Sequence, residues 1–101
     1  MQKFDVHKNI FEELFEVIKN RKRDKKDDSY TSTLMKSGQK QICKKFGEES
    51  IEVIIAALAE KKQDVVDESA DTLFHLFVLW AHMEIEIDDV TDELRLSLIH
   101  I

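Results

Sequence analysis

Apolar side chains recur along most of the chain at the three- and four-residue spacing that is typical of amphipathic helices. In residues 4–26 these positions alternate with charged side chains; they are Phe11, Leu14, Phe15 and Ile18. The segment ends in a basic run, residues 21–26, which either complements the negative end of a helix dipole or forms a rim that attracts phosphate. The pattern predicts a first helix over residues 4–26.

A short helix and a second long helix are predicted next. Ser29 or Thr31 would cap a helix over residues 30–36, and Gly38 would end it. A long helix is then expected over residues 39–60. Its apolar stripe, which predicts core packing, consists of Ile42, Phe46, Val53, Ala57 and Leu58.

The last part of the chain predicts two more helices. After a short turn, Asp64 would cap a helix over residues 65–83. Between residues 73 and 81 this helix is apolar on all sides except at His75, so we expect it to be buried. A further amphipathic helix would begin near Asp88.

Together these elements predict an all-α fold, a four- to five-helix antiparallel bundle made by a single domain of residues 1–101. A chain of 11.9 kDa can bury only a modest core. The helix over residues 65–83 has more apolar surface than the few other elements can cover. We therefore expect a homodimer, formed through Leu73, Phe77 and Trp80.

Composition narrows the classes of function. Acidic residues outnumber basic ones by 21 to 15, and the net charge of −6 argues against nucleic-acid binding. With no proline and two glycines, the chain lacks the turn residues of a β-sandwich or a glycine-rich phosphate loop. A single cysteine, Cys43, excludes an internal disulfide and a thiolate zinc site. No apolar run approaches ~20 residues and no signal peptide is visible, so a cytoplasmic protein without a membrane partner is expected.

Two pairs of carboxylates carry the candidate chemistry. Glu49 and Glu52 lie three residues apart, so they share one face of the helix over residues 39–60, and Glu68 and Asp71 share a face of the next helix. The short connection makes these helices antiparallel neighbours, with both pairs about equally far from the turn. Four facing carboxylates repel one another unless a cation offsets their charge, and all-oxygen ligands suit Mg²⁺ or Mn²⁺. The alternative is a set of solvated helix-surface charges.

Nearby side chains could complete a site for a phosphorylated ligand. Lys40 and Lys45 precede the acids on the same helix and could hold phosphate, or they could simply be solubilising surface lysines. His75 follows Asp71 by four residues on the same helix face. It could bond Asp71, contact a substrate or ligate a metal, and the alternative is a core histidine with its hydrogen bonds satisfied.

Four short stretches form a recognisable pattern over residues 29–90: Ser29-Tyr30-Thr31, Gly38 to Ile42, Lys45 to Glu49 with Glu52, and Glu68 with Asp71, His75 and Leu76. This pattern resembles the phosphoribosyl-ATP pyrophosphohydrolase family of histidine biosynthesis, a branch of the all-α NTP pyrophosphohydrolase superfamily. The carboxylate spacing is shared by many nucleotide hydrolases. The Ser-Tyr-Thr start, the lysine before Phe-Gly and the histidine after the last acid narrow the resemblance to this branch.

The resemblance implies a homodimeric, ATP-moiety-binding enzyme that uses Mg²⁺ to hydrolyse phosphoribosyl-ATP to phosphoribosyl-AMP and pyrophosphate. By position it implies four metal ligands: Glu49, Glu52, Glu68 and Asp71. The implied catalytic carboxylates are Glu48 and Glu49, with Glu48 as a base or as a ligand to a second ion. The implied substrate and phosphate contacts are Lys40, Lys45, His75, Tyr30 and Thr31.

One position departs from the family pattern, because Phe74 stands where the family usually has tyrosine, which removes one hydroxyl. Two other functions stay open. A house-cleaning hydrolase of a noncanonical dNTP would use the same carboxylates with another base pocket, and a non-catalytic helical dimerisation module would keep them as a solvated face. Stabilisation by Mg²⁺ would separate the two enzymes from the module.

Overall fold

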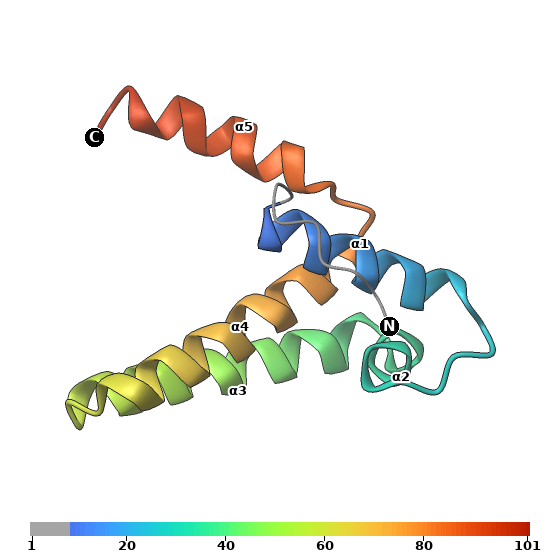
Figure 1. Cartoon of the computed structure of the whole chain (residues 1–101), viewed down its shortest axis with the longest axis horizontal. Helices are drawn as coiled ribbons and strands as arrows, with labels where there is room; N and C mark the ends of the chain where they lie inside the picture. The colour runs from blue at the N-terminus through green and yellow to red at the C-terminus, as the bar shows by residue number, and fades with distance from the viewer. Residues whose placement is uncertain (1–8) are drawn as a thin grey trace.

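The computed structural model describes residues 9–101, and within them the chain forms five α-helices and no β-strand (Figure 1). The helices are α1 (Ile10–Arg23), α2 (Tyr30–Ser37), α3 (Gln39–Leu58), α4 (Lys62–His82) and α5 (Ile87–Leu98). The predicted all-α class is confirmed. None of these helices is long and apolar enough to cross a membrane.

Both ends of α1 follow from local chemistry. The Asn9 side chain caps the helix by accepting the backbone N–H of Phe11 at 2.8 Å. The helix ends at Arg23, so residues 24–26 belong to the following loop and not to the helix predicted for them. The other end of that prediction, residues 4–8, lies outside the described residues.

Helix α2 is short and bounded as the sequence predicts. Ser29 is its cap, accepting the backbone N–H of Ser32 at 3.2 Å. Gly38 takes a φ of 93°, a conformation that side-chain-bearing residues rarely adopt, and it both ends α2 and precedes α3. The chain therefore changes direction sharply between the two helices.

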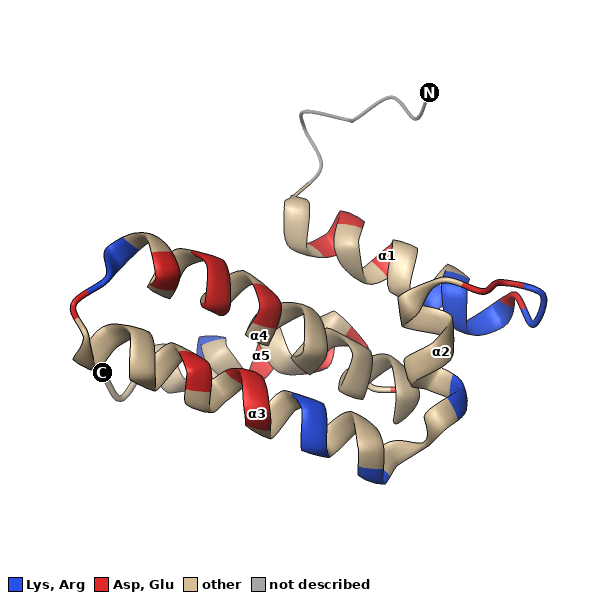
Figure 2. Ribbon diagram, turned by 90° about the horizontal axis from the view of Figure 1, so that it is seen from below, with Lys and Arg blue, Asp and Glu red and all other residues tan. Residues whose placement is uncertain are grey.

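Helices α3 and α4 form a long antiparallel hairpin, which is the most extensive contact between elements of the fold (Figure 2). The turn comes earlier than predicted, because Glu60 takes a φ of 58° and reverses the chain immediately after α3. Helix α4 consequently begins at Lys62, and Asp64 lies inside its first turn. The prediction that Asp64 caps this helix is wrong.

The core lies where α1 and α2 pack against the halves of α3 and α4 that are far from the turn between these two helices. It consists of Phe15, Ile18, Leu34, Ile42, Phe77, Val78 and Ala81. Phe77 is covered within its own chain, since the rings of Phe11 and Phe15 both pack edge-on against it. It is therefore not available for the predicted interface between subunits. At the hairpin end of α3, Leu58 was expected in the core but is 81% exposed.

Helix α5 projects away from the rest of the fold, and it makes only minor contacts with the other helices (Figure 1). Its start is held by Lys19, whose ammonium lies 3.0 Å from the Glu86 carboxylate. Glu86 and Asp89 also form a capping box at this end. The described residues thus form a four-helix core with a fifth helix extending from it, where the sequence predicted a four- to five-helix antiparallel bundle.

The loop between α1 and α2 offers a test of stability. The hydrogen bonds from Ser29 and the Arg21 guanidinium lower the pKa of Asp27 to about 2 from its ordinary value near 3.8. An acid whose pKa is lowered in the folded state stabilises that state above its unfolded pKa, and the contribution disappears as the pH falls through the folded value. Asp27→Asn should therefore lower the urea midpoint at pH 7, and the difference from wild type should shrink as the pH falls from about 4 toward 2. The neighbouring substitution Asp28→Asn is the control and should change the midpoint less; equal effects would contradict the assignment.

Candidate metal centre

Three carboxylates meet between α3 and α4. Glu49 comes from α3, Glu68 and Asp71 come from α4, and one oxygen of each lies within 4.8 Å of the others. In Figure 2 acidic residues occupy neighbouring stretches of the α3 and α4 ribbons. The i, i+3 spacing on α4 and the antiparallel hairpin bring together three of the four carboxylates that the sequence predicts to meet.

The electrostatics of this group are unfavourable without a cation. Partial burial raises the pKa of Glu68 above its ordinary value near 4.5, and the negative charges of Glu49 and Asp71 raise it further. The donor set is all carboxylate oxygen, which hard divalent cations prefer. The residues present therefore fit a hard divalent cation, whose charge would offset the repulsion.

The remaining predicted carboxylates lie beside this group. Glu52 is outside the three-residue cluster but lines a small cavity of about 140 Å³ together with Glu68, and its charge also raises the pKa of that residue. Glu48 is exposed, and its carboxylate lies 3.5 Å from the ammonium of Lys45. The lysine is thus held one turn before the cluster.

A hydrogen-bonded aromatic group continues the same face of α4. His75 is buried, with its Nδ1 2.7 Å from the backbone oxygen of Asp71 and its Nε2 3.0 Å from the Tyr30 hydroxyl. A carbonyl oxygen only accepts hydrogen bonds, so Nδ1 of the neutral ring carries the proton and Nε2 accepts from Tyr30. The Phe74 ring stacks on Tyr30 with centroids 6.1 Å apart. From the sequence, Phe74 is noted only for the hydroxyl that it lacks. Its place just before His75 could also have indicated that its ring belongs to the site.

The two other predicted phosphate contacts lie farther from the acidic cluster. Lys40 is exposed in the first turn of α3, and Thr31 is half-buried in the first turn of α2. Within residues 9–101, neither side chain makes a hydrogen bond or an ion pair with the carboxylates. Both residues therefore lie at helix N-termini, Thr31 on α2 and Lys40 on the helix that carries Glu49.

Comparison with known families shows to which family the chain belongs. The family model of phosphoribosyl-ATP pyrophosphohydrolase matches residues 11–97, which include every carboxylate described above. The chain belongs to this family.

Individual members of the phosphoribosyl-ATP pyrophosphohydrolase family agree with that assignment. A phosphoribosyl-ATP pyrophosphatase of Paramagnetospirillum magneticum is 51% identical over 84% of this chain and 78% of its own length. The phosphoribosyl-ATP pyrophosphatase of Metallosphaera sedula is 44% identical over 86% of this chain and 94% of its own length. A histidine biosynthesis bifunctional protein of Pyrococcus furiosus is 46% identical over 90% of this chain, which spans 42% of that longer protein.

The bond between Tyr30 and His75 can be tested directly. Tyr30→Phe keeps the ring that stacks on Phe74 and removes only the hydroxyl, so we expect a loss of about 1 kcal/mol in the free energy of unfolding. Urea unfolding would measure it, with Tyr30→Leu as a comparison that also removes the stacking. The ¹⁵N NMR spectrum of the wild-type protein reports the tautomer of the neutral His75 ring and should place its proton on Nδ1. A proton on Nε2 would contradict the hydrogen-bond assignment.

Proposed function

We propose that this chain hydrolyses phosphoribosyl-ATP to phosphoribosyl-AMP and pyrophosphate in histidine biosynthesis. Membership of the family over residues 11–97 is the observation that carries the proposal. The cluster of Glu49, Glu68 and Asp71 supports it, because a triphosphate needs positive charge at the site and these residues fit a divalent cation. The relatives from two organisms carry the corresponding activity in their names.

Mg²⁺ is the cation that best suits this proposal. Glu49, Glu68 and Asp71 would hold it, and Glu52, which lines a small cavity together with Glu68, would be the fourth ligand. When bound, the ion neutralises phosphate charge and lowers the pKa of water. Mn²⁺ has the same preference for oxygen ligands and could take its place.

The chain's own residues would position the substrate and move the proton. Glu48 is exposed beside the cluster, where its carboxylate can accept a proton from the attacking water. The ammonium of Lys45 lies 3.5 Å from the Glu48 carboxylate. Its positive charge would stabilise the negative charge that develops on the leaving pyrophosphate. Tyr30 is exposed and would contact the nucleotide, with Lys40 and Thr31 as outer contacts. His75 is buried and would act through Tyr30, whose hydroxyl it binds.

Substrate preference is the experiment that tests the function. Pyrophosphate release should show a kcat/KM for phosphoribosyl-ATP well above the values for ATP, dCTP and dUTP. The second ribose phosphate gives the enzyme binding energy that it can use to lower the barrier at the distant phosphorus. A ratio at or below one would support a house-cleaning dNTP hydrolase instead, and no release from any nucleotide would support a non-catalytic module.

The carboxylate assignment predicts a separation of activity from stability. Glu49→Gln, Glu68→Gln and Asp71→Asn should each lower kcat/KM by about 100-fold or more, since even residues that only orient metal ligands are worth about 10- to 100-fold. Without metal, each variant should melt at the same temperature as wild type or higher, because one repelling charge is gone. Glu93→Gln removes a charge from α5 and is the matched control. Mg²⁺ should raise the melting temperature of wild type and of the control but not of the three variants.

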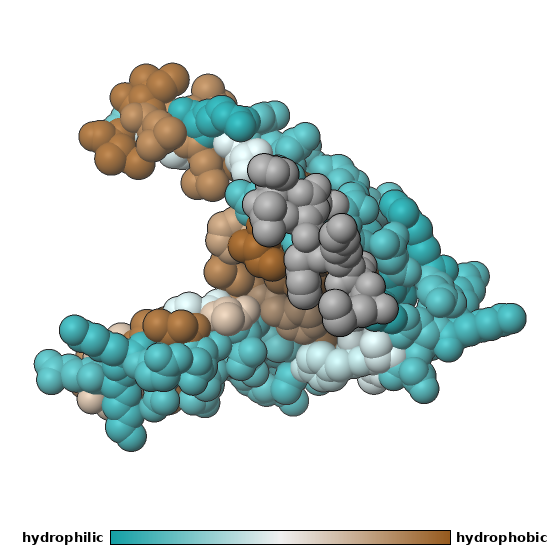
Figure 3. Space-filling model, viewed as in Figure 1, coloured by the Kyte–Doolittle hydropathy of each residue, from teal (hydrophilic) through white to brown (hydrophobic). Residues whose placement is uncertain are grey.

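We also propose that the active protein is a homodimer, with a surface that differs from the one predicted from the sequence. Large apolar side chains remain exposed on the α3–α4 hairpin and on α5: Ile51, Ile54, Ile55, Leu58, Val66, Leu94, Leu98 and Ile99. In Figure 3 the apolar surfaces of α5 and of the hairpin border an open notch. A second copy would cover both surfaces at once, and exposed apolar area of this extent is typical of an interface.

Assembly can be tested by light scattering. At micromolar concentration the wild-type chain should have the mass of a dimer or a larger oligomer. Ile54→Glu places a charge in the proposed interface, where burial would be costly, and should shift the mass to that of a monomer. Gln41→Glu adds the same charge to the other end of α3 and should leave the mass unchanged. A monomeric wild type would refute the dimer without affecting the family assignment.

A further inference from the structure

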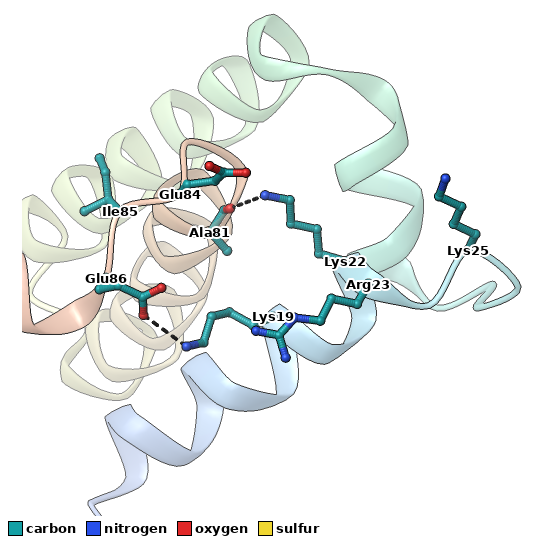
Figure 4. Close-up of a pocket in the computed structure, with 8 residues that line it drawn as sticks. All are labelled: Lys19, Lys22, Arg23, Lys25, Ala81, Glu84, Ile85 and Glu86. Atoms are coloured by element: carbon teal, nitrogen blue, oxygen red, sulfur yellow. Dashed lines mark hydrogen bonds and ion pairs between the residues drawn. The ribbon is translucent and has the colours of Figure 1, made fainter.

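A second polar site lies away from the carboxylates, where the end of α1, helix α2 and the end of α4 meet. It is a cavity of about 380 Å³ lined by Lys22, Asp24, Lys25, Ser32, Met35, Lys36 and His82. Lys22 and Lys25 also line a neighbouring cavity of about 530 Å³ (Figure 4). The two cavities share these two lysines, and we call them together the basic cleft.

The charge of the smaller cavity is positive, although the whole chain has a net charge of −6. Its three lysine ammonium groups outnumber the single carboxylate, that of Asp24. None of Lys22, Lys25 and Lys36 forms an ion pair within residues 9–101. In the larger cavity, Glu86 is already paired with Lys19, and Glu84 is the other carboxylate beside Arg23 and the two shared lysines in the lining.

Two of these lysines are held in place by the backbone. The Lys22 ammonium donates to the carbonyl oxygen of Ala81 at 2.7 Å, as Figure 4 shows. The Lys36 ammonium donates to the carbonyl oxygen of Asp27 at 3.2 Å and lies 3.4 Å from that of Lys25. An ammonium has three N–H donors, so each of these groups keeps at least one donor for a ligand.

His82 lines the same cavity and carries an unpartnered polar atom. Its Nδ1 is buried and has no hydrogen-bond partner among the described residues. Such an atom is costly unless something pairs with it. The hydroxyl-bearing side chain of Ser32, which is only 2% exposed, lines the cavity as well. Ammonium, imidazole and hydroxyl groups together are the donors that bind a phosphate monoester.

The basic cleft continues the helix face that carries the metal centre. His82 lies seven residues after His75 on α4 and eleven after Asp71, which are close to two and three turns of a helix. At 1.5 Å per residue, Asp71 and His82 are about 16 Å apart along the helix axis. That distance is the scale of a nucleotide and not of one phosphate. Helix α2 spans the interval, with Tyr30 on His75 and Lys36 at the cleft.

We propose that the basic cleft is a binding site for a phosphate monoester group. Its three ammonium groups and one carboxylate match the charge of a ribose 5-phosphate. The group can come from either of two sources, the phosphoribosyl end of the substrate or a separate phosphorylated ligand. Assigning it to the substrate rests on the proposed function; the existence of the site does not.

Binding can be measured apart from catalysis. Ribose 5-phosphate, titrated into the full chain in EDTA by calorimetry, should bind, whereas ribose should not. Lys25→Gln and Lys36→Gln should each weaken the affinity about tenfold, because hydrogen bonds to ionised groups are the strong kind. Lys26→Gln removes the same charge from the same basic run but lines neither cavity, so its affinity should match that of wild type. Melting temperatures would show that all three variants are folded.

The source of the phosphate follows from inhibition kinetics. If ribose 5-phosphate competes with phosphoribosyl-ATP and Lys25→Gln lowers kcat/KM about tenfold, the cleft holds the far phosphate of the substrate. Binding without competition supports the cleft as a site for a separate phosphorylated ligand. Absence of ribose 5-phosphate binding to wild type, or equal affinities of Lys25→Gln and Lys26→Gln, would overturn the proposal. Failure of the proposed function would instead appear as binding of ribose 5-phosphate with no pyrophosphate released.

Discussion

The mutual repulsion of Glu49, Glu68 and Asp71 is the constraint on which the rest of the structure depends. Like charges this close destabilise the hairpin that carries them, and partial burial of Glu68 adds to the cost. The apolar core stabilises only the end of the hairpin that packs against α1 and α2, because its buried residues lie there. The core therefore holds the hairpin firmly at one end, while the acidic cluster and the turn beyond it would be stabilised by the cation and the partner surface that we propose.

Helix α2 connects the parts of the proposed site although it is only eight residues long. Its first residue, Tyr30, bonds His75 beside the acidic cluster, and Ser32 and Lys36 line the basic cleft. Leu34, on another face of the helix, is buried in the core. A substrate that reached both ends would contact one short, well-anchored element, so that binding of the distant phosphate could influence the geometry at the metal centre without any long-range rearrangement.

A chain of this size cannot cover all of its apolar surface by itself. The exposed side chains on the hairpin and on α5 are large and aliphatic, and α5 makes little contact with its own chain. Covering them with a second copy would hold the hairpin from the side that the core does not reach. Assembly would then oppose the carboxylate repulsion, and the dimer would contribute to the metal centre as well as to solubility.

What the sequence by itself determined is local in origin. Helix periodicity, the Ser29 cap and the Gly38 stop depend on neighbouring residues, and so does the pairing of acids three residues apart. Together with the Ser-Tyr-Thr start, the lysine before Phe-Gly and the histidine after the last acid, this pairing already points to the family. Only the tertiary structure decided that Glu52 stands beside the cluster, that Phe77 is covered by its own α1 and that α5 extends from the core. The sequence leaves His82 without a role, yet packing brings it to lysines from two distant helices. The physical reason is that periodicity defines a face on one helix, whereas the partner of that face depends on how helices far apart in the chain cross.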